Sequence, residues 1–214
     1  MSNMNCPCKR TKCERHGNCD ECRAYHHGKS SGISLTRCEK LKKKEEKRTD
    51  RQGRKETIAM EVIYGVPSDI DSWMCLVNNV SWNFPGLETQ EKLEEHRETV
   101  LRFMNKKQAL CVKKGNEILG VILFSRGHNM ICCLAVSPEY RQCGIAAKLL
   151  EKALGELNAD KDITVSTFRE NDEKGIAPRA LYKKFGFVED ELIEEFGYPN
   201  QKFVLHPKGF DAKE

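Results

Sequence analysis

Apolar positions recur with two different periods between residues 57 and 207, and these periods predict alternating strands and helices. Runs rich in β-branched and aliphatic residues predict strands, whereas apolar steps of three and four predict helices. The predicted strands cover residues 57–65, 130–137, 162–168, 191–199 and 201–207, together with a hairpin over 109–127 that turns at Gly115-Asn116. The predicted helices cover residues 68–80, 89–105, 145–157 and 177–185. The resulting order, β-α-α-β-β-β-α-β-α-β-β, predicts a mixed α/β fold.

Two of these helices carry the clearest local signals. Helix 68–80 starts with Ser68 as the expected N-cap and Asp71 three residues later, which resembles a capping box. Helix 145–157 carries an apolar stripe that predicts one buried face, formed by Ala146, Leu149, Leu150, Ala153, Leu154 and Leu157.

The first 56 residues differ from this body in composition. They contain 16 Lys and Arg against 8 Asp and Glu, whereas the remaining residues contain 20 against 24. Residues 1–38 are rich in cysteine and too poor in large aliphatic side chains to form a packed core, so metal or disulfides must order them. Residues 39–56 are almost entirely charged and predict a basic linker, helical at its start. The domain proper is expected over residues 57–207.

The N-terminal cysteines have the spacing of metal ligands. Cys19 and Cys22 are separated by two residues, as in a zinc knuckle, and Cys13 and His16 repeat that spacing. The sequence therefore favours zinc, with an iron–sulfur cluster, disulfides or unligated thiols as alternatives. The expected ligands are the six cysteines of this segment, with His16, His26 and His27 among them: Cys6, Cys8, Cys13, Cys19, Cys22 and Cys38.

Features that are absent from the sequence indicate the expected location and partners of the chain. Its first residues contain no apolar signal core, and no run approaches the ~18 apolar residues of a membrane span, so the expected location is the cytoplasm and no membrane partner is expected. Nucleic-acid binding by the basic segment is not favoured, because acidic residues interleave and only Tyr25 could stack on a base. Protein docking or self-association, including a homo-oligomer, is compatible with the sequence.

Residues 141–146 join a predicted strand to a predicted helix and predict an anion site. The backbone N–H groups of a helix N-terminus attract phosphate, which needs small residues to approach closely. Gly144 and Ala146 supply this space and Arg141 adds a cation. An ordinary strand-turn-helix connection, in which Gly144 only forms the turn, is the alternative.

This segment resembles motif A of the GNAT N-acetyltransferase superfamily, Gln/Arg-x-x-Gly-x-Gly/Ala, because Arg141, Gly144 and Ala146 fill its specified positions. Downstream, "RALYKKFGF" (Arg179–Phe187) resembles the motif B helix of the same superfamily. The resemblance implies a mixed, splayed central sheet flanked by helices, here preceded by the small Cys-rich segment. It also implies that acetyl-coenzyme A is bound between the fourth and fifth strands.

The resemblance also implies roles for individual residues. Tyr182 occupies the position of the family's general acid, with a core role as the alternative. Asn171 is the candidate for a coenzyme-contacting asparagine, although the loop around it is longer than usual and an ordinary loop role is the alternative. The remaining expected coenzyme contacts come from the strand and from the helix N-terminus: Leu134, Ala135, Val136, Arg141, Gln142, Cys143, Gly144, Ile145 and Ala146.

The general base is missing from the fourth strand, where some members of the superfamily carry a glutamate. Cys132 and Cys133 in that strand are interpreted as small buried residues rather than nucleophiles, and His128 is a further candidate base. Acidic residues crowd 189–195, where they either attract a cationic amine or form a solvated face. The sequence thus favours a cytoplasmic enzyme that acetylates a primary amine on a small molecule or protein. A metal-binding interaction or sensing module with a weakly active coenzyme domain is the alternative.

Overall fold

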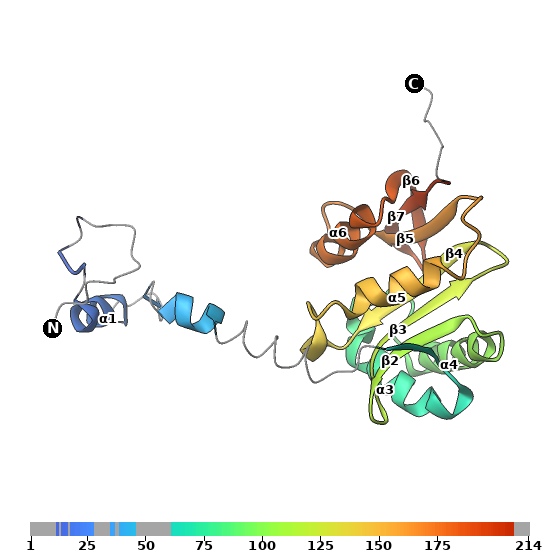
Figure 1. Cartoon of the computed structure of the whole chain (residues 1–214), viewed down its shortest axis with the longest axis horizontal. Helices are drawn as coiled ribbons and strands as arrows, with labels where there is room; N and C mark the ends of the chain where they lie inside the picture. The colour runs from blue at the N-terminus through green and yellow to red at the C-terminus, as the bar shows by residue number, and fades with distance from the viewer. Residues whose placement is uncertain are drawn as a thin grey trace, which may run out of the picture. The chain divides into compact units, whose positions relative to one another are not determined.

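The computed structural model describes residues 12, 14–16, 18–27, 35–36, 39–45 and 61–207, and it divides the chain into two compact units, Met1–Glu56 and Thr57–Glu214 (Figure 1). Among these residues no helix combines the length and the hydropathy that a membrane crossing requires.

A seven-stranded sheet forms the centre of the larger unit. Its spatial order is β1-β2-β3-β4-β5-β7-β6, and every neighbouring pair is antiparallel except β4 and β5. The strands are β1 (Val62–Tyr64), β2 (Ala109–Lys114), β3 (Glu117–Ser125), β4 (Met130–Val136), β5 (Ile163–Phe168), β6 (Val188–Glu195) and β7 (Tyr198–Leu205).

Four α-helices accompany this sheet in the predicted chain order, which confirms the predicted fold class. They are α3 (Ile70–Val80), α4 (Gln90–Asn105), α5 (Ile145–Leu154) and α6 (Ile176–Lys184). Short 3-10 turns join them to their neighbours: η1 (Pro67–Asp69), η2 (Ser81–Asn83), η3 (Pro138–Tyr140) and η4 (Glu173–Gly175).

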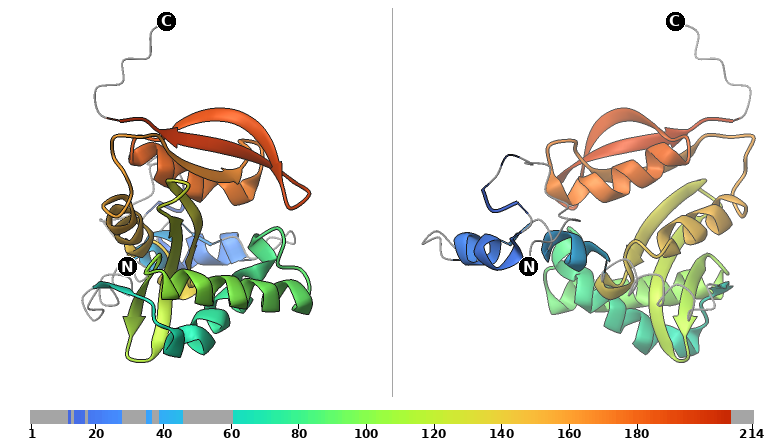
Figure 2. Two further views of the ribbon diagram at one scale, coloured as in Figure 1. Left: turned by 90° about the vertical axis from the view of Figure 1, so that its right-hand side faces the viewer. Right: turned by 60° about the vertical axis from the view of Figure 1, so that its left-hand side comes forward.

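The two faces of the sheet hold two separate apolar cores. One core contains Ile145, Leu149, Leu150 and Ala153 of α5, together with the side chains of Tyr182 and Phe203. The other core contains the buried side chains of α3 and α4, with Trp73 and Val100 among its most buried members. In Figure 2, α3 (teal) and α4 (green) lie in the lower part of the larger unit, and α6 (orange) lies beside β7. The alternation of side chains along β3 and β4 therefore sends neighbouring residues into different cores.

Several predicted elements have different boundaries in the structure; the helix predicted over 145–157, for example, ends at Leu154. Helix α3 begins at Ile70 rather than at residue 68, because Ser68 lies inside η1 and the Asp69 carboxylate accepts the Val66 N–H at 3.1 Å. The proposed capping box of Ser68 and Asp71 is therefore wrong. The strand predicted over 191–199 is two strands, β6 and β7, joined by a tight turn. The strand predicted over 57–65 contains β1, which covers Val62–Tyr64. Residues 57–60 lie outside the described part of the chain.

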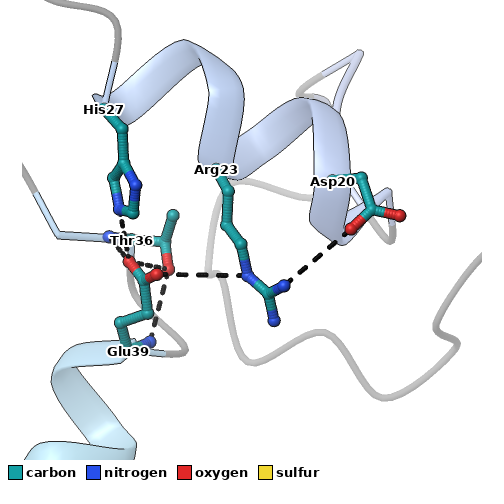
Figure 3. Close-up of polar contacts among 5 residues, drawn as sticks. All are labelled: Asp20, Arg23, His27, Thr36 and Glu39. Atoms are coloured by element: carbon teal, nitrogen blue, oxygen red, sulfur yellow. Dashed lines mark hydrogen bonds and ion pairs between the residues drawn. The ribbon is translucent and has the colours of Figure 1, made fainter.

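The smaller unit is organised around Glu39 (Figure 3). Thr36 donates its backbone N–H and its hydroxyl to Glu39 Oε2 at 2.8 and 2.9 Å, and the Glu39 N–H returns to Thr36 Oγ1 at 3.3 Å. This is a capping box at the start of the helical residues 39–45. His27 at the end of α1 (Cys19–His27) lies 3.1 Å from the same carboxylate. The hydrogen bonds from the Thr36 backbone and hydroxyl, together with the contact from His27, lower the pKa of Glu39 to about 2.

Candidate functional site

Strands β4 and β5 pair over two residues and then diverge. Their pairs are Met130 with Thr164 and Ile131 with Val165, although both strands continue beyond them. The opposite edge of β4 remains paired with β3 as far as Val136. In Figure 1, β5 lies above β4 and the two strands run apart from each other. The β5-facing backbone of β4 beyond Ile131 is therefore available to hydrogen-bond a ligand strand, as a sheet edge does.

A β-bulge interrupts β4 at the point of divergence. Leu123 of β3 pairs with Cys133, whereas the next residue, Phe124, pairs with Ile131, so Cys132 has no partner in the ladder. A bulge of this kind bends its strand and re-aims its side chains. Cys132 is consequently exposed and Cys133 half-buried, although the sequence pattern favoured two buried thiols.

Helix α5 begins after a sharply turned backbone. Gly144, its N-cap residue, has φ 87° and Gln142 has φ 63°, both in the left-handed region. A Cβ placed on Gly144 would meet no heavy atom within 4 Å, so the space beside it is open. The first-turn N–H groups of an α-helix lack partners within the helix, and its dipole favours an anion there. The start of α5 is therefore suited to a phosphate group.

Arg141 lies next to this helix start. Its side chain is exposed, and its Nε donates to the Val136 carbonyl oxygen at 3.5 Å. The guanidinium thus lies at the end of β4, where it adds positive charge beside Gly144.

The predicted coenzyme-binding residues fall into two groups by exposure. Buried side chains anchor the segment in the cores, and these residues could contact a ligand through their backbone only: Ala135, Cys143 and Ile145. The others are exposed or half-buried: Leu134, Val136, Arg141, Gln142, Gly144 and Ala146. Asn171 is exposed in the β5–α6 loop, and its neighbour Asp172 anchors that loop by accepting the Lys174 N–H and the Tyr198 hydroxyl.

Tyr182 lies on α6 with its ring inside the first core. Its side chain is 4% exposed, and its ring lies 5.7 Å from that of Phe187 and 6.2 Å from that of Phe203. Burial, with a contribution from the Cys133 thiol, raises the pKa of Tyr182 above its ordinary value. The phenol is thus held protonated close to the strand that diverges from β5.

Both thiols on β4 are also held protonated. Neighbouring protein atoms partly desolvate the Cys132 thiol although the residue is exposed, and this effect, followed by the charge of Glu195, raises the pKa of Cys132 to about 11. Burial, followed by the Cys132 charge, raises the pKa of Cys133 to about 12. A thiolate is the nucleophilic form of cysteine, so these values argue against a covalent acyl-cysteine route.

The acidic residues of β6 differ in their partners. Glu189 binds both Arg179 and Lys183 at 2.6 Å. Asp190 and Glu191 share Lys202, at 3.1 and 2.9 Å. For Glu194 and Glu195, no ion pair with a cation occurs within residues 61–207.

Arg179 is a structural residue that the sequence analysis did not identify. It is 5% exposed, donates to the Phe168 carbonyl oxygen at 3.2 Å, and lies 5.0 Å from the centre of the Phe203 ring. It therefore ties α6 to the last residue of β5 and, through Glu189, to β6. The position of Arg179 within the motif B segment was its only signal in the sequence.

The tip of the β6–β7 hairpin meets the loop before α4. Phe196 and Gly197 have φ 53° and 71°, the two positive values of a type I′ turn. A Cβ on Gly86 would come within 2.8 Å of the Phe196 ring, so glycine permits this contact. Lys174 of η4 donates to the Trp82 carbonyl oxygen at 3.4 Å. The two halves of the diverging sheet are thus joined at one end, where Trp82 and Phe196 remain 64% and 78% exposed.

Most of the predicted metal ligands lie outside the described residues: Cys6, Cys8, Cys13 and Cys38. Cys19 and Cys22 lie on α1, and Cys22 is not in a disulfide. In the described portion, no group of three or more His, Cys, Asp or Glu side chains is arranged to hold a metal ion. Zinc therefore stays a prediction.

Comparison with known proteins agrees with this geometry. Residues 105–189 match the family model described as "Acetyltransferase (GNAT) domain". No curated protein gives a significant sequence match. Solved structures resemble the chain at low identity. An N-acetyltransferase from Staphylococcus aureus Mu50 is 19% identical, with a TM-score of 0.55 over 68% of this chain and 100% of its own. A GNAT-family acetyltransferase from Bacillus cereus ATCC 10987 is also 19% identical, with a TM-score of 0.52 over 69% and 96%.

A third similar structure is RimL, a ribosomal L7/L12 α-N-protein acetyltransferase in complex with coenzyme A. It is 13% identical, with a TM-score of 0.51 over 70% of this chain and 94% of its own. The sheet with its flanking helices is thus the GNAT acetyltransferase fold, and residues 105–189 match that domain in sequence as well.

Proposed function

We propose that this chain is an acetyl-coenzyme A-dependent N-acetyltransferase that acetylates a primary amine on a small molecule or a protein. The observation that carries the proposal is the combination of a diverging β4–β5 pair with an open, glycine-headed helix N-terminus beside it. We place the activity in the cytoplasm, on the sequence alone.

The residues of the site fit the coenzyme in three places. The N–H groups at the start of α5, with Arg141, would hold the pyrophosphate. The free edge of β4 from Leu134 to Val136 would hydrogen-bond the extended pantetheine arm, as an added strand would. Asn171 would be a further contact from the β5–α6 loop.

The chemistry requires a donor to the thioester carbonyl and a proton for the departing sulfur. Acetyl-coenzyme A supplies the acetyl group as a thioester. A backbone N–H near Leu134 would polarise its carbonyl, as an oxyanion-hole donor does. Tyr182 would protonate the sulfur, because its phenol carries a proton at neutral pH and its ring lies in the core that also contains Ile131 and Leu134 of β4.

The coenzyme site is tested by calorimetry on Gly144→Glu. The variant places bulk and negative charge where the phosphate would lie, so acetyl-coenzyme A binding should be lost. Gly115→Glu is the matched control, because Gly115 also has positive φ, at 61°, and open space around its Cβ, but lies in the β2–β3 turn. Unchanged affinity in folded Gly144→Glu would overturn the site.

The activity is tested by an acceptor screen with polyamines, aminoglycosides, amino acids and lysine peptides. Coenzyme A release should be quantified by chromatography rather than by a thiol reagent, because the chain contributes 11 cysteines of its own. Release that depends on one amine class would identify the acceptor.

A coenzyme-binding module with little activity is the second candidate. It is favoured by one observation: β4 carries two protonated thiols where a carboxylate could serve as base. Tight acetyl-coenzyme A binding without turnover on any amine would support it.

The Cys-rich segment is proposed to bind zinc through Cys6, Cys8, Cys13, Cys19, Cys22 and Cys38. The full-length protein, purified anaerobically, should contain zinc by elemental analysis. The double variant Cys19→Ser, Cys22→Ser should lose it, whereas Cys75→Ser, which changes an exposed cysteine on α3, should retain it. Metal-free wild-type protein would count against the site.

A further inference from the structure

Strand β4 has no carboxylate where it diverges from β5, but the β6–β7 hairpin places a carboxylate in the same region. Glu195 is the last residue of β6 and pairs with Tyr198 across the type I′ turn. Two residues earlier, Ile193 pairs with Asn200, which in turn pairs with Phe168, the last residue of β5. Glu195 therefore lies beyond the end of β5, where β4 and β5 are already apart.

Register also fixes the face on which Glu195 lies. Residues that pair directly across a sheet point to the same face, and residues two apart along a strand share a face. Glu195 thus shares a face with Ile193 and Phe168, and the Tyr198 ring indeed packs edge-on against Phe168 at 5.6 Å. Tyr182 lies against the opposite face, through Phe203.

Across the divergence, β4 presents Cys133 to the core formed with α3 and α4, which is the face of Glu195. The charge of Glu195 reaches the exposed Cys132 thiol at the bulge and contributes to its raised pKa. Glu195 is half-buried, whereas its neighbour Glu194 is exposed on the other face of the strand. The carboxylate is therefore directed toward the part of β4 where the thioester would lie.

The charged and titratable groups around Glu195 come from three elements. Cys132 of β4 is near enough for the Glu195 charge to contribute to its raised pKa, and Asp172 accepts the hydroxyl of the opposing Tyr198 at 2.5 Å. Lys174 is the nearby cation, 5.7 Å from the Tyr198 ring, and it is bonded to the Trp82 carbonyl oxygen. Within residues 61–207 none of these groups forms an ion pair with Glu195, so no cation of this part of the chain occupies its carboxylate.

We propose that Glu195 is the general base of the acetyl transfer, a role that rests on the proposed N-acetyltransferase function. Its carboxylate would attract the ammonium form of the acceptor and take one proton from it. The neutral nitrogen then bonds to the acetyl carbon as the carbon–sulfur bond breaks and the electron pair leaves on sulfur. Tyr182 protonates that sulfur and recovers a proton from the newly acylated nitrogen. Glu195 finally releases its proton to water, so that amine cation and thioester give amide, thiol and one proton.

The test compares Glu195→Gln with Glu194→Gln, a matched change on the neighbouring residue. Turnover of the amine found in the screen should fall at least about a hundredfold in Glu195→Gln at pH 7, because a general base usually contributes at least this factor to the rate. The Glu194→Gln variant should stay within about twofold of wild type, since the residue is exposed. The deficit of Glu195→Gln should shrink as the pH is raised from 7 to 9, because a larger fraction of the amine is then already neutral. Calorimetry should show equal acetyl-coenzyme A affinity in all three proteins.

A second measurement does not depend on turnover. Alkylation of Cys132 by iodoacetamide, followed by peptide mass spectrometry, should be faster in Glu195→Gln, because removing the carboxylate lowers the thiol pKa. The Glu194→Gln variant should react as wild type does.

The possible outcomes distinguish a failure of the base role of Glu195 from a failure of the proposed acetyltransferase function. Near-normal turnover in Glu195→Gln with an unchanged pH profile would overturn the base role while the acetyltransferase stands. An unchanged alkylation rate would also overturn it, because the carboxylate would then not face β4. If the wild-type chain releases no coenzyme A with any amine, the proposed function itself fails, and the base role fails with it.

Discussion

Gly120 of β3 lies directly beneath Ile145 of α5. A Cβ on Gly120 would come 2.5 Å from Cγ2 of Ile145 and 3.2 Å from Cδ1 of Leu149. Gly120 also pairs with Val136 at the end of β4. The missing side chain thus fixes how closely the first turn of α5 approaches the strand whose edge would hold the coenzyme.

Gly120→Ala should therefore damage both stability and the phosphate site. Because β-branched Ile145 cannot move its Cγ2 aside alone, α5 must shift, at a cost of about 1–3 kcal/mol. Acetyl-coenzyme A affinity should fall with it. Gly127→Ala is the control, since a Cβ there meets nothing within 4 Å. Urea unfolding and calorimetry on both variants would measure the two effects, and a neutral Gly120→Ala would show that α5 tolerates displacement.

Arg179 should be essential to the packing of α6. Arg179→Ala leaves the buried Phe168 carbonyl oxygen without its donor, whereas Glu189 keeps Lys183, so we expect a loss of about 1–3 kcal/mol in unfolding free energy. Lys183→Ala removes only the exposed partner of the same carboxylate and should cost about 0–1 kcal/mol. Equal unfolding midpoints for the two variants would contradict a structural role for Arg179.

The sequence alone predicted the order of the elements and the segment that contains the proposed site, because periodicity and small residues are local signals. It did not predict the bulge at Cys132 or the place of Glu195 opposite β4. Both depend on strand register, which is set by pairs between distant residues such as Phe124 with Ile131 and Ile193 with Asn200. The start of α3 was misplaced for a local reason, since Asp69 rather than Ser68 provides the carboxylate that binds the preceding backbone.

His96 on α4 should make the chain sensitive to acid. Its Nε2 is fully buried and has no hydrogen-bond partner among the residues described, and burial lowers the pKa of the imidazole. In the unfolded chain the imidazole regains its ordinary pKa of about 6.5, so below this pH the unfolded state binds the proton more readily. Stability should therefore be constant above about pH 6.5 and decrease as the pH falls below it.

The His96→Leu variant should lose less unfolding free energy than wild type between pH 7.5 and pH 5.5, as measured by urea unfolding at each pH. His128→Leu, in the exposed β3–β4 turn, should behave as wild type. The same loss in His96→Leu and wild type would assign the acid sensitivity to other groups.

Tyr182→Phe tests the proton donor of the proposed mechanism. The ring contacts with Phe187 and Phe203 remain in this variant, so the melting temperature should change little. Turnover should nevertheless fall at least about a hundredfold, because no proton is offered to the departing sulfur. Coenzyme affinity should be nearly unchanged, since it depends on β4 and on the start of α5.

Tyr64→Phe provides the contrasting control for Tyr182→Phe. It removes a hydrogen bond of 2.5 Å from the Tyr64 hydroxyl to Glu156, at the opposite end of α5 from Gly144. This variant should lose about 1 kcal/mol of stability and keep its turnover. A purely structural Tyr182 predicts that Tyr182→Phe behaves in the same way, with a lower melting temperature and normal turnover. Turnover, coenzyme affinity and melting temperature measured on both variants therefore distinguish an acid from a core residue.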